Sequence, residues 1–249
     1  MSIPTGRFVW FEYVSQDARK AQGFFGELFG WSTKNVPMPD GDYTMIAAPD
    51  GKTIGGYFAS PDPSAGKASW LPYLQVQSAA EIAAKVKKLG GSVMKDPFKV
   101  GDFATMAVVL DPHGAGFALW QPNKVEDPGK PVAGHFCWNE LASKDPKASV
   151  AFYTAIGGFT ENKMEMQGMG TYHLLESDGQ GRAGIMAQSM PEQPHAWLPY
   201  VQVASADQTA EKAKRLGATV VVPPTQIPNV GRFAIFVDAQ GAATGILQP

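Results

Sequence analysis

The chain has 249 residues, 44% of them hydrophobic and 18% charged, a balance typical of a globular protein with a sizeable core. Its formal net charge of -2 gives no sign of a basic surface that would bind nucleic acids or anionic membranes. Its single cysteine, Cys137, excludes an intramolecular disulfide. No apolar run approaches the roughly 20 residues of a membrane helix, and MSIPTGRFVWFEY contains no secretory signal. We therefore expect a cytoplasmic monomer or homodimer whose partner is a small molecule, not nucleic acid or a membrane.

The first predicted elements are a strand and a helix. The segment FVWFEYV, residues 8–14, is rich in aromatic and β-branched side chains, which predicts a strand. Asp17 fits a helix N-cap, and the helix that follows ends at Gly30, as helices often end at glycine. Two or three short strands follow, near YTMIAAP and TIGGYFA.

The same pattern then begins again. WLPYLQV, residues 70–76, predicts a strand, and Ser78 with Glu81 fits a capping box for a helix that closes at Gly90. Strands run through ATMAVVLD and GFALWQ. The first half of the chain therefore predicts strand, helix and further strands, twice over.

The second half of the chain repeats the first. FVWFEYVSQD from Phe8 returns as FCWNELASKD from Phe136, and WLPYLQV returns as WLPYVQV from Trp197. The closing segments DPHGAGFALWQP and DAQGAATGILQP also match. We predict two domains, 1–122 and 134–249, joined by a Pro-rich charged linker at 123–133 and containing four βαβββ modules in all.

This arrangement resembles the vicinal oxygen chelate superfamily of glyoxalases, bleomycin resistance proteins and extradiol dioxygenases. The residues that carry the resemblance are Asp145, Phe152, Tyr153, Gly158 and the closing turn at 111–114. It implies an α+β fold in which the two modules of each domain form a cup-shaped mixed sheet with helices outside. The family hosts lyases, dioxygenases, isomerases and drug-binding proteins, so the fold leaves the activity open.

The resemblance also implies where a metal would be held. The family's metal ligands, a His on a first strand and a Glu on a last strand, correspond here to Trp10, Leu71, Ala118, Trp138, Leu198 and Gly245. None of these side chains binds divalent metals. We therefore expect no cofactor, with a divalent metal only if this alignment of ligand positions is wrong.

The two copies share an aromatic strand face with one carboxylate. Alternate strand residues lie on one face, which groups Phe8, Trp10 and Glu12, and this set recurs as Phe136, Trp138 and Glu140. Aligning the modules places Tyr73 opposite Glu12 and Tyr200 opposite Glu140. If the tryptophans take the family's ligand position, this face is the cup, and it suits a small hydrophobic or aromatic ligand.

Three roles are open for Glu12 and Glu140. They could bind a polar group of the ligand, act as catalytic general bases among aromatic side chains, or be structural and paired with an arginine or a backbone turn. The second copy also has His173 and Arg232, which we expect to distinguish its cup and to hold a carboxylate or phosphate of the ligand.

Two classes of function follow. The first is a metal-free binding protein, similar to the family's drug-resistance members. The second is an enzyme, a glyoxalase-like lyase or a relative of the dioxygenases or hydroxylases, with shifted metal ligands or with Glu12 or Glu140 as the base. The sequence does not decide between a binding protein and an enzyme.

Overall fold

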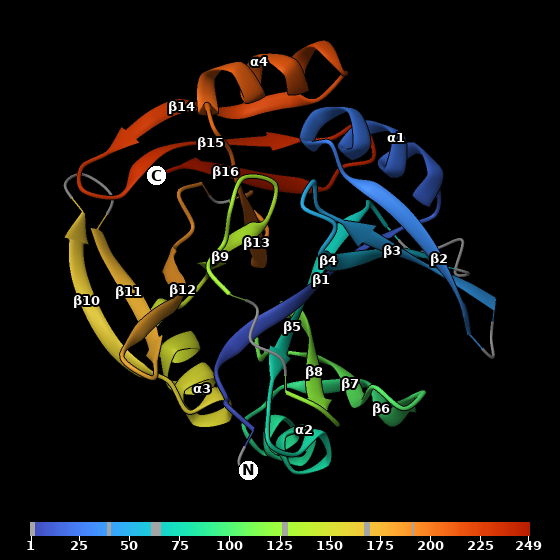
Figure 1. Ribbon diagram of the computed structural model, residues 1–249. Helices are drawn as coiled ribbons and strands as arrows, with labels where there is room; N and C mark the ends of the chain where they lie inside the picture. The colour runs from blue at the N-terminus through green and yellow to red at the C-terminus, as the bar shows by residue number, and fades with distance from the viewer. Residues whose placement is uncertain (1–2, 39–40, 61–65, 126–128, 167–169, 191) are drawn as a thin grey trace. The chain divides into compact units, whose positions relative to one another are not determined.

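A computed structural model of the protein describes residues 3–38, 41–60, 66–125, 129–166, 170–190 and 192–249 (Figure 1). Part of the predicted linker at 123–133 lies outside these residues. No helix in the described part of the chain has the length and apolar character needed to cross a membrane.

Four βαβββ modules follow one another along the chain. The first comprises β1 (Arg7–Ser15), α1 (Ala18–Phe29), β2 (Ser32–Met38), β3 (Gly41–Ala47) and β4 (Thr53–Ala59). The second comprises β5 (Ser69–Gln75), α2 (Ala79–Lys88), β6 (Ser92–Val100), β7 (Ala104–Leu110) and β8 (Gly116–Pro122). The third comprises β9 (Phe136–Ser143), α3 (Pro146–Gly157), β10 (Thr160–Met166), β11 (Gly170–Ser177) and β12 (Gln180–Ala187). The fourth comprises β13 (Ala196–Gln202), α4 (Ala206–Arg215), β14 (Thr219–Ile227), β15 (Gly231–Val237) and β16 (Ala243–Gln248).

The strands of each copy form one mixed eight-stranded sheet. The strand order is β2-β3-β4-β1-β5-β8-β7-β6 in the first copy and β10-β11-β12-β9-β13-β16-β15-β14 in the second. Within the first module β1 pairs in parallel with β4, with Glu12 opposite Gly56, and β9 pairs with β12 with Glu140 opposite Gly184. The predicted α+β class and the four modules are confirmed.

The helices begin and end at the residues expected from the sequence. Asp17 and Asp145 are the N-caps of α1 and α3, and their side chains accept hydrogen bonds from the backbone N–H groups of Lys20 and Ala148. Both helices end at a glycine in the left-handed region, Gly30 at φ 73° and its counterpart at φ 70°. Local capping chemistry therefore determines both ends of these helices.

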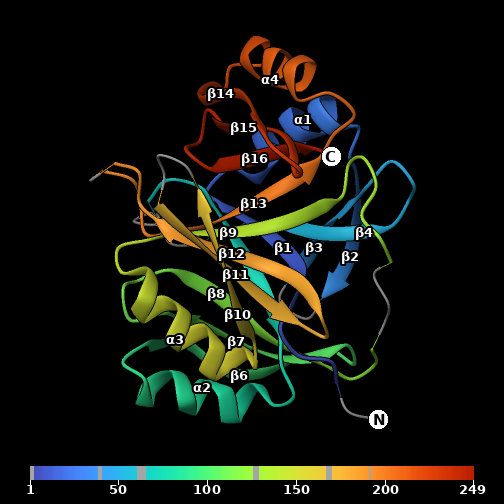
Figure 2. The same ribbon diagram turned by 90° about the vertical axis from the view of Figure 1, so that its left-hand side faces the viewer.

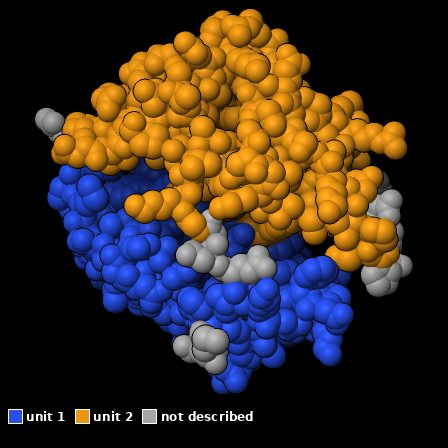
Figure 3. All heavy atoms as spheres, viewed as in Figure 1, with its two compact units in different colours: residues 1–9, 72–127, 138–197 blue, residues 10–71, 128–137, 198–249 orange. Residues whose placement is uncertain are grey.

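The chain divides into two compact units that Figure 3 distinguishes by colour. Unit 1 comprises residues 1–9, 72–127 and 138–197, and unit 2 comprises residues 10–71, 128–137 and 198–249. Each unit combines modules from different copies, whereas each sheet keeps to one copy. That the copies 1–122 and 134–249 are the domains stays a prediction.

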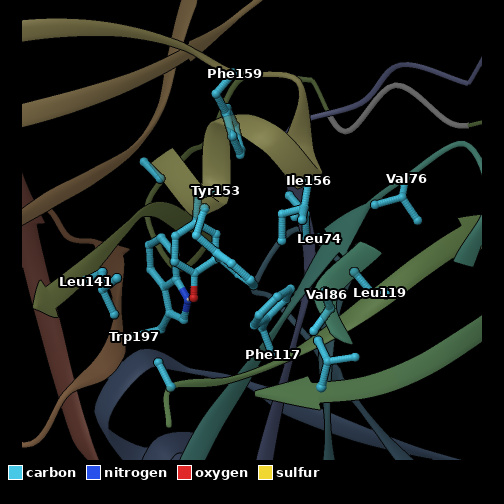
Figure 4. Packing of buried hydrophobic residues seen from close by; sticks show 14 of the residues in the cluster. Leu74, Val76, Val86, Phe117, Leu119, Leu141, Tyr153, Ile156, Phe159 and Trp197 are labelled. Atoms are coloured by element: carbon cyan, nitrogen blue, oxygen red, sulfur yellow. The ribbon is translucent and has the colours of Figure 1, made fainter. Parts of the chain in front are cut away.

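The core of unit 1 lies beneath α2 and α3, which are side by side (Figure 2). Figure 4 shows the Tyr153 ring in the middle of this core, with its centroid 5.0 Å from that of Trp197 and 5.4 Å from that of Phe117. The Tyr153 hydroxyl donates to Asp111 Oδ2 at 3.1 Å and accepts from Trp197 Nε1 at 2.9 Å. His195 Nε2 also lies 2.7 Å from this carboxylate, so Asp111, Tyr153, Trp197 and His195 form one buried hydrogen-bonded cluster.

The core of unit 2 is largely aromatic. Tyr13 of β1 packs against Phe25 of α1 and against Trp70, with ring centroids 5.5 and 5.1 Å apart. Its hydroxyl donates to Asp238 Oδ2 at 2.6 Å. Asp238 stands in the fourth module where Asp111 stands in the second, so a closing-turn aspartate accepts a buried tyrosine hydroxyl in both units.

Candidate functional site

A hydrogen-bonded relay of three side chains lies in the first module. Trp10 Nε1 donates to the Tyr43 hydroxyl at 3.1 Å, and that hydroxyl donates to Glu12 Oε1 at 2.8 Å. On β1, Tyr13 packs against α1, so Trp10 and Glu12, which alternate with it, point to the opposite face of the strand. We call Trp10, Tyr43 and Glu12 the first relay, and the face of the module opposite its helix the relay face.

The third module contains the same arrangement, the second relay. Trp138 Nε1 donates to the Tyr172 hydroxyl at 2.9 Å, which donates to Glu140 Oε2 at 2.9 Å. Leu141, the next residue on β9, is fully buried in the core of unit 1, so Trp138 and Glu140 again face away from the helix. Each relay lies wholly within one compact unit.

A glycine beneath each tyrosine makes room for the relay. A Cβ atom added to Gly56 would lie 2.0 Å from the Tyr43 hydroxyl oxygen, and one added to Gly184 would lie 1.8 Å from that of Tyr172. These glycines are the strand partners of Glu12 and Glu140. Because no side chain stands on the neighbouring strand at that point, the tyrosine can cross it and reach the carboxylate.

The electrostatics of the relays keep both tyrosines neutral. Burial and the nearby Glu12 carboxylate raise the pKa of Tyr43 far above its usual value, and burial and Glu140 do the same to the pKa of Tyr172. A neutral phenol can donate only one hydrogen bond, and here it donates to the glutamate. Each relay therefore presents a carboxylate that a phenol orients, and an indole in turn holds that phenol in place.

The structure brings only some of the predicted cup residues onto the relay face. Phe8 packs against Trp197 in the core of unit 1, with ring centroids 4.9 Å apart, and Phe136 stacks on Phe11 in unit 2 at 4.1 Å. Other aromatic rings therefore cover both side chains, and the contribution of Phe8 and Phe136 to a ligand site stays a prediction.

The predicted tyrosines of the second and fourth modules are buried. Tyr73 packs against Trp120 with ring centroids 5.7 Å apart, and Tyr200 packs against Phe233 at 6.5 Å. Their predicted positions opposite Glu12 and Glu140 stay predictions.

His173 and Arg232 lie on the helix side of their strands, not on the relay face. On β11, Tyr172 belongs to the relay, so His173 points the other way, where its Nδ1 lies 2.6 Å from Glu161 Oε1. On β15, Arg232 shares a face with the buried Phe236 and forms two hydrogen bonds, of 2.7 and 2.8 Å, with Asp207 of α4. Both side chains thus face the helix layer, and the expectation that His173 and Arg232 bind a ligand in the second cup stays a prediction.

The residues at the family's metal positions do not fit a divalent ion. Trp10 and Trp138 carry indole N–H groups that are donors only, and both already donate to tyrosines. A Cβ at Gly245 would lie 2.4 Å from the Tyr200 ring, so a glutamate there would overlap that ring as it now lies. Within the described residues, no three His, Cys, Asp or Glu side chains converge to hold a metal.

Tyr43 and Tyr172 were absent from the sequence-based site. A signal for them exists in the repeat. Each tyrosine is the third residue of its strand, and the two lie 129 residues apart, while Gly56 and Gly184 lie 128 residues apart. The pairing of tyrosine with glycine becomes meaningful only when the neighbouring strands are in register.

Sequence comparison places the chain among known proteins. A model of the bleomycin resistance protein-like N-terminal domain matches residues 7–49, and one of the glyoxalase/bleomycin resistance protein/dioxygenase superfamily matches residues 133–244. The chain is 34% identical over 245 residues to "Putative glyoxylase CFP32" of Mycobacterium tuberculosis, with 96% of this chain and 94% of the relative covered. It is 28% identical to the anthracycline biosynthesis protein DnrV of Streptomyces peucetius, covering 98% of this chain and 93% of the relative.

Solved structures share the fold. The Mn(II)-bound glyoxalase from Novosphingobium aromaticivorans aligns with a TM-score of 0.67 at 14% identity, over 99% of this chain and 83% of that one. The 2,2',3-trihydroxybiphenyl 1,2-dioxygenase from Sphingomonas wittichii aligns with a TM-score of 0.68 at 13% identity, over 98% and 91%. With its four modules, its two matched family models and a relative of this identity along almost its full length, the chain belongs to the glyoxalase/bleomycin resistance protein/dioxygenase, or vicinal oxygen chelate, superfamily.

Proposed function

We propose that this protein binds a small, planar, largely hydrophobic organic molecule on its relay faces, and that it does so without the family's divalent metal. The observation that carries the proposal is the Trp–Tyr–Glu relay, which stands in both copies where the resemblance places the first metal ligand. The indole offers an apolar surface for a ring of the ligand, and the oriented carboxylate offers an acceptor for a hydroxyl or amine.

The relatives support the ligand class. DauV and DnrV of Streptomyces are named as anthracycline biosynthesis proteins, and anthracyclines are fused-ring aromatic compounds that carry hydroxyl groups. A flat, hydroxylated ring system has the two properties that a relay face can recognise, an aromatic surface and a hydrogen-bond donor.

A catalytic role for Glu12 and Glu140 is a narrower form of the same proposal. A carboxylate oriented by a tyrosine could remove a proton from a bound ligand, but binding must come first. Any ligand-binding contribution of Tyr73 and Tyr200 belongs to the proposal as well.

The test combines metal analysis with a binding titration. The probe is alizarin, a hydroxylated anthraquinone, and binding is followed by quenching of tryptophan fluorescence in protein purified without a metal-affinity tag. We expect saturable binding that weakens by about tenfold in Glu12→Gln and Glu140→Gln, since a hydrogen bond to a charged group contributes about 1.5–3 kcal/mol. Arg232→Gln, on the helix side, serves as the matched control and should bind like the wild type.

Two results would contradict the proposal. Stoichiometric iron, zinc, nickel or manganese in the purified protein would favour the alternative, a metal-dependent glyoxalase-like lyase or dioxygenase with shifted ligands. Alizarin affinity unchanged by both glutamine substitutions would leave the relays as purely structural features.

A further inference from the structure

Unit 1 has a groove on its outer side, away from the relay face. Figure 1 shows α3 lying against β10 and β11, and these three elements line an open groove of about 540 Å³. Its ionisable side chains are Lys147 of α3, Glu161 and Lys163 of β10, and His173 of β11. From α3, Thr154 adds a hydroxyl group, and Ala151 and Ala155 supply apolar surface. The volume lies within the range of small-molecule sites, and all of these residues belong to one compact unit.

The histidine in this groove is held in one orientation. His173 Nδ1 lies 2.6 Å from Glu161 Oε1, and since a carboxylate can only accept, the imidazole donates from Nδ1. The side chain of His173 is only 13% exposed. Glu161 also forms an ion pair with Lys163, whose Nζ lies 3.6 Å from Glu161 Oε1. One carboxylate thus organises both basic neighbours.

The charges in the groove leave one positive charge in excess when the imidazole is neutral. Lys147 and Lys163 contribute two positive charges, and Glu161 compensates one of them. Within the described residues Lys147 forms no ion pair, and it lines the same groove as the other three groups. A cationic rim beside apolar helix surface suits a molecule with a single anionic group and an apolar body.

The first copy does not have this set of groups. By the strand pairing, Lys163 and His173 are partners in the third module, and Asn35 and Thr44 are partners at the same place in the first. There Thr44 Oγ1 donates to Asn35 Oδ1 at 3.0 Å, and Thr33 stands where Glu161 stands. The ionisable groups are therefore not needed to build this pair of strands.

We propose that this outer groove is a second binding site, specific to the third module, for a monocarboxylate with a short apolar body. The carboxylate group lies between Lys147 and Lys163, the imidazole held by Glu161 forms the adjoining wall, and the apolar body lies along Ala151 and Ala155. This site is independent of the relay faces, because Tyr172 and His173 are consecutive on β11 and point to opposite sides of it.

Isothermal titration calorimetry with octanoate tests the proposal, with octanamide as the uncharged counterpart. The wild-type protein should bind octanoate saturably and about tenfold more tightly than octanamide. The variant Glu161→Thr/Lys163→Asn/His173→Thr introduces the first copy's side chains and should lose this preference. Lys147→Gln removes one charge at an exposed helix position, where the fold is not at risk. It should weaken the binding of octanoate and leave that of octanamide unchanged.

The control is Glu140→Gln, which alters the relay face and should leave octanoate affinity unchanged. The proposal is overturned if the wild type shows no saturable octanoate binding, or if octanamide or Lys147→Gln gives the same affinity as the wild type with octanoate. Loss of octanoate binding in folded Glu140→Gln would also overturn it, because the ligand would then lie on the relay face.

Discussion

The substitution Gly184→Ala tests whether the second relay depends on the absence of a side chain beneath Tyr172. The new methyl carbon would lie 1.8 Å from the tyrosine hydroxyl oxygen, and real Cβ contacts are essentially never below 3.0 Å. The hydroxyl must therefore move by about 1.2 Å, which breaks or strains its 2.9 Å hydrogen bonds to Trp138 and Glu140. Two weakened hydrogen bonds and a displaced ring correspond to a loss of about 2–4 kcal/mol.

Whether Gly184→Ala stabilises or destabilises the protein shows whether the added methyl group meets the tyrosine. The backbone of Gly184 does not have the positive φ that disfavours alanine. Where space allows, replacing glycine by alanine stabilises a protein by about 0.4–1 kcal/mol, because the unfolded chain has less conformational freedom. Gly23 of α1 offers the matched control, since nothing lies within 4 Å of its added Cβ, and Gly23→Ala should stabilise.

Differential scanning calorimetry measures the outcome. For a protein of this length we expect Gly184→Ala to lower the Tm by roughly 5–10 °C. A second measurement uses the Tyr172→Ala background, in which the methyl group meets no ring and Gly184→Ala should be neutral or stabilising. A wild-type or higher Tm for the single variant would refute the reasoning, as would an equal loss in both backgrounds.

Three further predictions concern other parts of the molecule. Burial by itself would raise the pKa of Asp111, but hydrogen bonds from His195 and from backbone N–H groups outweigh it and lower that pKa, so the carboxylate stabilises the fold above its unfolded-state pKa. Stability measured by urea denaturation should therefore fall as the pH drops through the folded-state pKa, and Asp111→Asn should flatten this dependence; an unchanged slope would contradict the assignment. Burial raises the pKa of the Cys137 thiol to about 12, so Ellman's reagent at pH 8 should react with it only after denaturation, and rapid labelling of the native protein would show otherwise. Asp145→Ala removes the acceptor for the Ala148 N–H and should lower the free energy of unfolding by about 1 kcal/mol in the same urea assay. Lys144→Ala, one residue before the cap, should leave the free energy of unfolding unchanged.

Much of the local structure could be predicted from the sequence because short-range chemistry determines it. Asp17 and Asp145 begin their helices by accepting backbone hydrogen bonds, and Gly30 ends one because glycine tolerates the left-handed region. The repeat then extended these assignments from one copy to the other. Trp70 and Trp197, which begin the repeated WLPY segments, are both buried.

The candidate site could be predicted only in part. Strand alternation correctly paired Trp10 with Glu12 and Trp138 with Glu140, because side chains two residues apart share a face. It could not identify Tyr43 and Tyr172 as the residues that connect them, since each comes from a strand that is two strands away in the sheet. Nor could it show that His173 faces α3, because an isolated strand does not indicate which of its two faces a helix will cover.

The amino-acid sequence by itself therefore determined the modules, their duplication, the helix boundaries and which residues share a strand face, all of which depend on neighbours close along the chain. Only the tertiary structure decided which face each helix covers, that Phe8 and Phe136 pack into cores, and that a tyrosine crosses a glycine to reach a glutamate. It also decided that each compact unit combines modules from different copies. These features depend on register and packing between segments far apart in the chain, and no local pattern encodes them.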